Sequence, residues 1–114
     1  MLKPGFGIID EIDKYKNYAV YEPEKYSCVY IDSDYIDDWW EGLAEIKTYL
    51  HRMNRPGFAF SRWGVTLIPP QSLSKLLDIV LEDSRIYTDN NLVTLVNKIQ
   101  EAMEANKFMI HFGV

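Results

Sequence analysis

The chain has 114 residues, of which 47% are hydrophobic and 14% aromatic, as is typical of one folded domain spanning residues 1–114. Its formal net charge of -5 disfavours direct binding to nucleic acid or to an anionic membrane, because both contacts require cations that neutralise phosphate. No apolar run approaches the roughly 20 residues of a membrane span, and the single Cys28 cannot form an internal disulfide. We therefore expect a cytoplasmic protein.

The first third of the chain contains turn-forming residues and short apolar runs. The spacing of Ile8, Ile9, Ile12 and Tyr15 favours a short helix over an edge strand. Residues 26–31 are rich in β-branched and aromatic side chains, and this composition predicts a strand.

A long amphipathic helix is predicted next, from about Tyr35 to Met53. Asp32, Ser33 or Asp34 can cap its first turn. Its apolar side chains recur at three- and four-residue steps, which is the pattern of a helix with one buried face. This stripe consists of Ile36, Trp39, Trp40, Leu43, Ile46, Leu50 and Met53. The turn-forming residues 54–57 are expected to end the helix.

The second half of the chain alternates between strand and helix signals. A short strand at 58–60 is possible, and residues 63–68 predict a strand whose core face carries Trp63, Val65 and Leu67. Three elements follow: a helix from Pro69 to about Glu82, a helix capped by Thr88 or Asp89 that ends near Asn106, and a strand at 108–112. This order predicts an α+β fold, in which a three- or four-stranded sheet carries about three helices mainly on one face.

The negative charge of the chain is concentrated in residues 31–41, which hold five carboxylates and no cation. One or two carboxylates suffice to cap the predicted helix and to complement its dipole. The remaining acids, with the aromatic residues among them, form a candidate partner-binding surface. The candidate binding residues are Asp34, Tyr35, Asp37, Asp38, Trp40 and Glu41.

The adjacent Trp39 and Trp40 point about 100° apart on a helix. Only one of them can occupy the centre of the buried stripe, so the other is expected at its margin. A marginal Trp beside carboxylates is suited to be an interface anchor with a charged rim, although packing under the N-terminal segment would also explain it.

Neither a catalytic motif nor a cofactor motif is present, so we expect a protein that is not an enzyme and that uses no cofactor. The acids at 32–43 do not match a calcium-binding EF-hand, because Asp37 stands where that loop has Gly and Leu43 where it has Glu. A less favoured alternative is a metal-dependent enzyme that uses Asp32, Asp34 and Asp38.

Residues 62–73, Arg-Trp-Gly-Val-Thr-Leu-Ile-Pro-Pro-Gln-Ser-Leu, together with the acidic helix start at 32–41, resemble small acidic immunity proteins of bacterial polymorphic-toxin and contact-dependent inhibition systems. The resemblance implies a cytoplasmic antidote that binds one toxin domain, often a nuclease, and blocks its active site. A nuclease presents cations to phosphate, so an acidic cover can compete for the same surface.

The sequence therefore favours a non-enzymatic inhibitor with a basic protein partner, acting as a monomer or homodimer. The alternative from a different class is a structural or regulatory module that forms a homodimer, or binds another protein, through an exposed apolar face.

Overall fold

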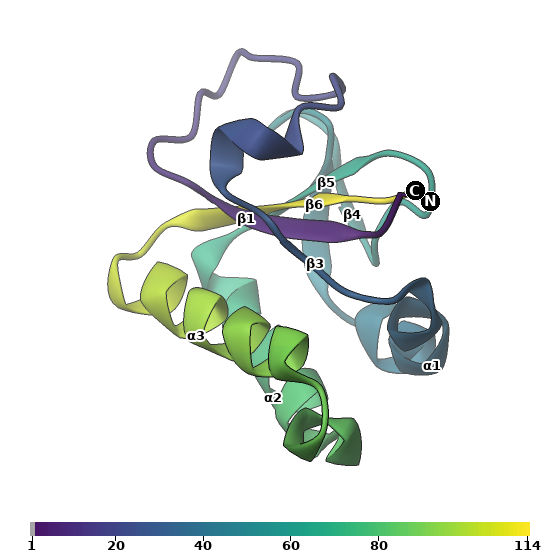
Figure 1. The fold of residues 1–114 in the computed structure, drawn as a ribbon. Coiled ribbons are helices and arrows are strands. Elements are labelled where there is room, and N and C mark those ends of the chain that lie inside the picture. The colour runs from purple at the N-terminus through teal and green to yellow at the C-terminus, as the bar shows by residue number, and fades with distance from the viewer. Residues whose placement is uncertain (1) are drawn as a thin grey trace.

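The computed structural model describes residues 2–114, and this part of the chain forms three α-helices and one antiparallel sheet of six strands (Figure 1). The strand order is β2-β1-β6-β5-β3-β4. The strands are β1 (Gly5–Ile9), β2 (Val29–Tyr30), β3 (Lys47–Leu50), β4 (Pro56–Phe58), β5 (Val65–Ile68) and β6 (Phe108–Phe112). The helices are α1 (Ser33–Leu43), α2 (Leu73–Glu82) and α3 (Asn90–Glu104). The predicted α+β class is confirmed, but the prediction of three or four strands is wrong.

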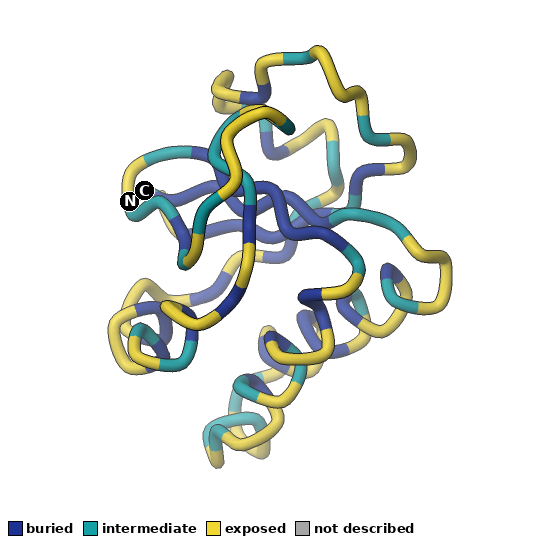
Figure 2. The backbone as a smooth tube through the Cα atoms, turned by 180° about the vertical axis from the view of Figure 1, so that it is seen from behind, coloured by how far each residue is buried: buried dark blue, intermediate teal, exposed yellow. Residues whose placement is uncertain are grey.

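The sheet is covered on both faces. All three helices lie on one side of it, and residues 10–28 cross the other side (Figure 1). The helical side forms the larger hydrophobic cluster, which includes Trp39, Leu43 and Leu95. The opposite side forms a smaller hydrophobic cluster that includes Tyr18, Leu67 and Phe112. The strands β1, β5 and β6 are consequently buried along most of their length. The exposed residues lie in the outer strands, at the outer sides of the helices and in the loops (Figure 2).

The predicted helix from Tyr35 to Met53 is wrong in its second half. The helix ends at Leu43, where the Ala44 and Glu45 amides donate to carbonyls of the last turn, and the chain then enters β3. β3 pairs with both β4 and β5, so its backbone groups gain partners on two sides. Strand pairing thus overrides the helical spacing of Ile46, Leu50 and Met53. The residues predicted to end the helix instead lead into β4, whose Pro56 is tolerated because β4 is an edge strand.

The predicted short N-terminal helix is also wrong, because Ile8 and Ile9 belong to strand β1, and Ile12 and Tyr15 lie in the loop that follows it. β1 lies inside the sheet, between β2 and β6. A side chain at Gly7 would place its Cβ 2.6 Å from the Cβ of Tyr26 and 2.9 Å from the sulfur of Cys28. The glycine therefore permits the close approach of the segment before β2. Of the strand predicted at 26–31, only Val29–Tyr30 is extended in the sheet, since Tyr26 ends a 3-10 turn, η1 (Pro23–Tyr26).

The C-terminal half follows the sequence prediction closely. α2 follows a 3-10 turn at Pro70–Ser72, Asp89 caps α3 by accepting from the Asn91 amide, and β6 spans the predicted residues. The exception is Trp63, which precedes β5 and is 78% exposed rather than buried. Every residue of β5 is buried, because the helices and residues 10–28 cover its two faces.

Candidate functional site

The acidic residues at 32–41 lie at the start and along the exposed side of α1. Asp32 has an extended backbone and caps the helix, because its Oδ1 accepts from the Asp34 amide at 2.9 Å. Asp34, Asp37, Asp38 and Glu41 are exposed. The predicted cap is confirmed, and it uses one of the five carboxylates.

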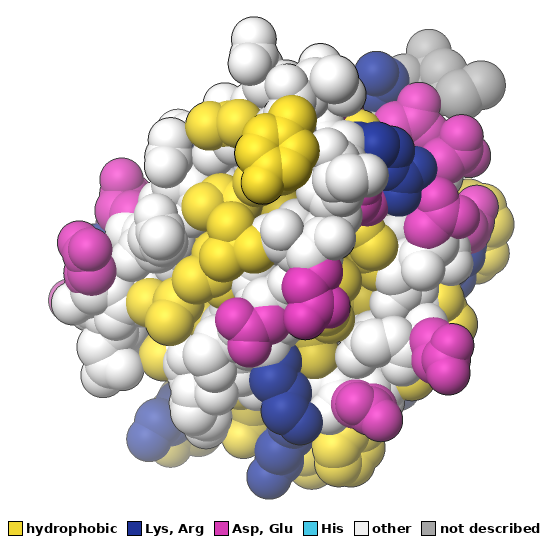
Figure 3. Space-filling model, turned by 90° about the horizontal axis from the view of Figure 1, so that it is seen from below, with side chains coloured by type: hydrophobic (Ala, Val, Ile, Leu, Met, Phe, Trp, Pro, Cys, Tyr) yellow, Lys and Arg dark blue, Asp and Glu magenta, His cyan; other side chains and the backbone are white. Residues whose placement is uncertain are grey.

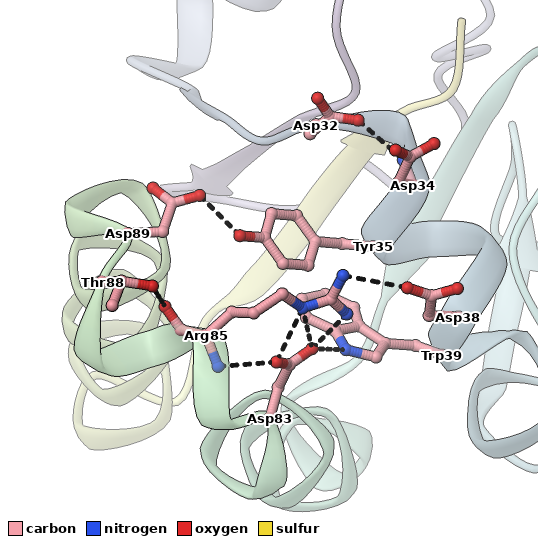
Figure 4. Close-up of polar contacts among 9 residues, drawn as sticks. All are labelled: Asp32, Asp34, Tyr35, Asp38, Trp39, Asp83, Arg85, Thr88 and Asp89. Carbon is pink, nitrogen blue, oxygen red and sulfur yellow. Dashed lines mark hydrogen bonds and ion pairs between the residues drawn. The ribbon is translucent and has the colours of Figure 1, made fainter.

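The inner side of α1 is aromatic and its polar atoms have partners within the protein (Figure 4). Trp39 is 6% exposed, stacks on Tyr35 with ring centroids 5.3 Å apart, and donates from Nε1 to Asp83 Oδ2 at 2.8 Å. Tyr35 donates from its hydroxyl to Asp89 Oδ2 at 2.7 Å. Burial and this hydrogen bond raise the pKa of Tyr35 to about 12. Tyr35, a candidate binding residue in the sequence, therefore helps to fix α1 to the rest of the domain.

Arg85 joins α1 to the connection between α2 and α3. It lies in the 3-10 turn η3 (Ser84–Tyr87), and its guanidinium stands 4.4 Å from the centroid of the Tyr35 ring (Figure 4). The guanidinium donates to Asp83 Oδ2 at 2.6 Å and to Asp38 Oδ2 at 2.9 Å. The hydrogen bonds that Asp83 accepts from Arg85 hold the pKa of its carboxyl well below its usual range. Asp38, although exposed, is thus already paired.

A second arginine occupies the other side of α1. Arg62 forms an ion pair with Asp37, and its guanidinium lies 5.3 Å from the centroid of the partly buried Trp40 ring. Trp39 points inward and Trp40 lies at the margin, as the angle between adjacent helical residues predicts. Residues 31–41, which contain no cation, thus form ion pairs with Arg62 and Arg85 from segments far along the chain.

An open cleft of about 550 Å³ separates α1 from α2. Gly42 of α1 lies close to Ile79 of α2, since a Cβ on Gly42 would lie 3.1 Å from Ile79 Cδ1. The cleft is lined by Asp38, Trp39, Glu41, Gly42, Glu45, Ile79, Glu82, Asp83 and Arg85. Figure 3 views the molecule from the side of the helices, where carboxylate side chains border apolar ones.

Three carboxylates of this cleft lack an ion partner among the residues that the structure describes. Glu41, Glu45 and Glu82 are exposed, and none of them forms an ion pair with any residue of 2–114. Glu41 was a candidate from the sequence, whereas Glu45 and Glu82 were not. Glu45 follows Glu41 by one helical turn, which is a signal the sequence contained. The place of Glu82 opposite α1 depends on how the helices pack.

The described residues offer no metal site at the acidic stretch. Among residues 2–114, no three His, Cys, Asp or Glu side chains are grouped so that they could hold a metal ion, and Asp32, Asp34 and Asp38 accordingly do not form such a group. No helix in this part of the chain is both long enough and apolar enough to cross a membrane. Comparison of the chain with protein families, curated proteins and solved structures finds no match.

Proposed function

We propose that the protein is a non-enzymatic inhibitor of the immunity type, which binds a basic protein domain through the exposed side of α1 and the cleft between α1 and α2. The observation that carries this proposal is the set of carboxylates in a concave surface, Glu41, Glu45 and Glu82, that have no ion partner among residues 2–114. A partner that supplies lysine or arginine side chains would provide the missing counter-charge.

The electrostatics of such a contact favour fast and specific association. Like-signed carboxylates around a cleft attract a cationic partner from a distance and repel acidic proteins. A nuclease is a suitable target, because its active site holds cations that bind phosphate, and an acidic cover of these cations would block the substrate. We accordingly place the protein in the cytoplasm, as an antidote to a toxin domain.

The test is a double charge reversal, Glu41→Lys with Glu45→Lys. The matched control is Glu101→Lys with Glu104→Lys on α3. It changes the net charge equally, and neither residue lines the cleft. Each tagged protein is expressed in its native host, and retained proteins are identified by mass spectrometry at low and at high salt. We expect a basic protein to be retained at low salt by the wild type and by the control.

The cleft variant should not retain this basic protein at low salt. With the purified partner, we expect its dissociation constant to rise by roughly 10- to 100-fold, mainly through a slower association rate with a weaker salt dependence. Equal binding by the cleft variant and the α3 control would refute the assignment of the site. Retention of no basic protein by the wild type would refute the function.

Homodimerisation is a second candidate function, and different residues favour it. Trp63 is 78% exposed and Phe58 is 66% exposed, and large apolar side chains at a surface are often covered in an assembly. A dimer that forms through these residues would persist at high salt. Sedimentation velocity at low and at high salt distinguishes it from a monomer that requires a basic partner.

A further inference from the structure

Trp63 is a large apolar side chain that does not contribute to the interior of the protein. It is 78% exposed and packs in neither of the two hydrophobic clusters that residues 2–114 form. Tryptophan is mostly buried in folded proteins, and its exposure leaves a large apolar area in water. The fold therefore does not explain why this position carries an indole.

The loop that carries Trp63, residues 61–64, is held by hydrogen bonds of its backbone at both ends. The Ser61 amide donates to Thr66 Oγ1 at 2.8 Å, and the Gly113 amide donates to the Gly64 carbonyl at 2.8 Å. A Cβ on Gly113 would lie 2.3 Å from the Ser61 carbonyl oxygen, so the C-terminal segment lies tightly against the loop. A fixed loop loses little conformational entropy on binding, which suits an exposed side chain to act as a contact residue.

Arg62 connects this loop to α1. Its guanidinium lies 5.3 Å from the ring centroid of Trp40 and 6.0 Å from that of Trp63, and it forms an ion pair with Asp37. We call Trp40, Arg62 and Trp63 the tryptophan–arginine cluster. Tryptophan and arginine are the residue types most enriched at the energetic centres of protein interfaces.

The charges beside the cluster indicate the chemistry of the partner. Arg62 is neutralised by Asp37, whereas Glu41, one helical turn further along α1, has no ion partner among residues 2–114. The cluster is therefore flanked by uncompensated negative charge. A partner that fits both features has an apolar pocket bordered by lysine or arginine side chains.

We propose that Trp63 is the apolar anchor of the proposed partner contact, and that its indole enters an apolar pocket on the same basic domain whose cations face Glu41. This inference rests on the proposed function and adds to it the residue that supplies most of the non-electrostatic affinity. Arg62, whose guanidinium lies 6.0 Å from the Trp63 ring centroid, connects the indole to α1 through its ion pair with Asp37.

The test uses Trp63→Ala, with Tyr15→Ala as the control. Tyr15 is also a highly exposed aromatic residue, 96% exposed, and lies in the segment that crosses the opposite face of the sheet. The probe is the basic protein that the wild type retains from a lysate of its host at low salt, purified after its identification. Dissociation constants are measured by calorimetry at low and at high salt, and melting temperatures confirm that both variants are folded.

We expect Trp63→Ala to raise the dissociation constant by roughly 30-fold, the size typical of an interface hot spot. The loss should be similar at both salt concentrations, unlike that of the Glu41 and Glu45 reversal, and Tyr15→Ala should remain within twofold of the wild type. If Trp63→Ala changes the dissociation constant by less than twofold while the charge reversal still weakens binding, Trp63 is not the anchor of the contact. The proposed function would then remain intact.

Two other outcomes also overturn the anchor. If the wild type retains no basic protein, the proposed function fails and the anchor fails with it. If the only species retained is a second copy of this chain, and Trp63→Ala abolishes it, the cluster belongs to a homodimer interface instead.

Discussion

The two sides of α1 carry the same kinds of residue and use them differently. Toward the α2–α3 connection, Trp39 and Asp83 form a largely buried network with Arg85. Toward the loop at 61–64, Trp40 and Asp37 contact Arg62 at a surface that water reaches. The comparison shows that the same pairing of aromatic, carboxylate and arginine lies within the fold where the carboxylate is buried, and lies at the surface, where solvent weakens it, where the carboxylate is exposed.

The largest expected difference between the two sides is that between the adjacent tryptophans. Trp39→Ala should lower the free energy of unfolding by about 3–5 kcal/mol, because it leaves a cavity in the core and an unpaired carboxylate oxygen. Trp40→Ala should lower it by only about 1 kcal/mol, since the ring is partly exposed. Urea denaturation followed by circular dichroism measures both values. Equal losses would mean that the two sides of α1 are equally important for stability.

Loss of the carboxylate at Asp83 should lower the free energy of unfolding more than its loss at Asp37. We expect this difference to be smaller than that between the two tryptophans. Asp83→Asn should cost about 2 kcal/mol of unfolding free energy, because the amide replaces a charged acceptor of bonds from Arg85 and Trp39. Asp37→Asn should cost less than about 1 kcal/mol, because its ion pair with Arg62 is exposed. A cost for Asp37→Asn as large as that for Asp83→Asn would contradict the distinction.

The pH dependence of stability sharpens this test. The pKa of Asp83 lies below its ordinary value of 3.8 chiefly because Arg85 donates hydrogen bonds to it. Its contribution to stability is therefore complete above that value and is lost progressively as the pH falls from it toward the lowered pKa of the folded state. The difference in unfolding free energy between wild type and Asp83→Asn should therefore shrink between about pH 5 and about pH 2. Burial lowers the pKa of His111 to about 3, so both proteins lose stability below pH 6.5 and the difference isolates Asp83. A constant difference would show that the charge of Asp83 is unimportant.

Arg62→Ala is expected to have a small effect, comparable to that of Asp37→Asn. It removes one exposed ion pair and the contacts with the indoles of Trp40 and Trp63, so the free energy of unfolding should fall by less than about 1 kcal/mol. Chemical denaturation by urea at two salt concentrations should show that most of this loss disappears at about 1 M salt, where exposed charges are screened. A larger loss that is insensitive to salt would mean that Arg62, like Arg85, is part of the fold.

The elements that could be predicted from the sequence are those whose local signals agree with their final packing. α2 and α3 have apolar stripes with clear starts, and Asp89 caps α3 as expected. The error at Lys47–Leu50 arose because these residues fit a helical stripe locally, and only pairing with β4 and β5 makes them a strand. The helical spacing that begins at Ile8 and Ile9 misled the prediction of β1 in the same way. The strand predicted at 26–31 is present but shorter, because Tyr26 ends η1.

The candidate site divides along similar lines. The acidic run and the divergence of Trp39 from Trp40 follow from residue types and helical geometry, and the sequence alone determined them. It also predicted a cap among residues 32–34, and the structure selects Asp32. The sequence did not indicate that Trp63 is exposed, since alternation placed it on the core face of a strand that in fact begins two residues later.

Only the tertiary structure decided which carboxylates are free. Arg62 and Arg85 lie more than twenty residues from the acidic run in the sequence, and the fold brings them to Asp37 and Asp38. It also brings Glu82 to the cleft that Glu41 lines. The physical reason is that a local pattern fixes the direction of a side chain on its own helix, whereas its counter-charge depends on which distant segments pack beside it.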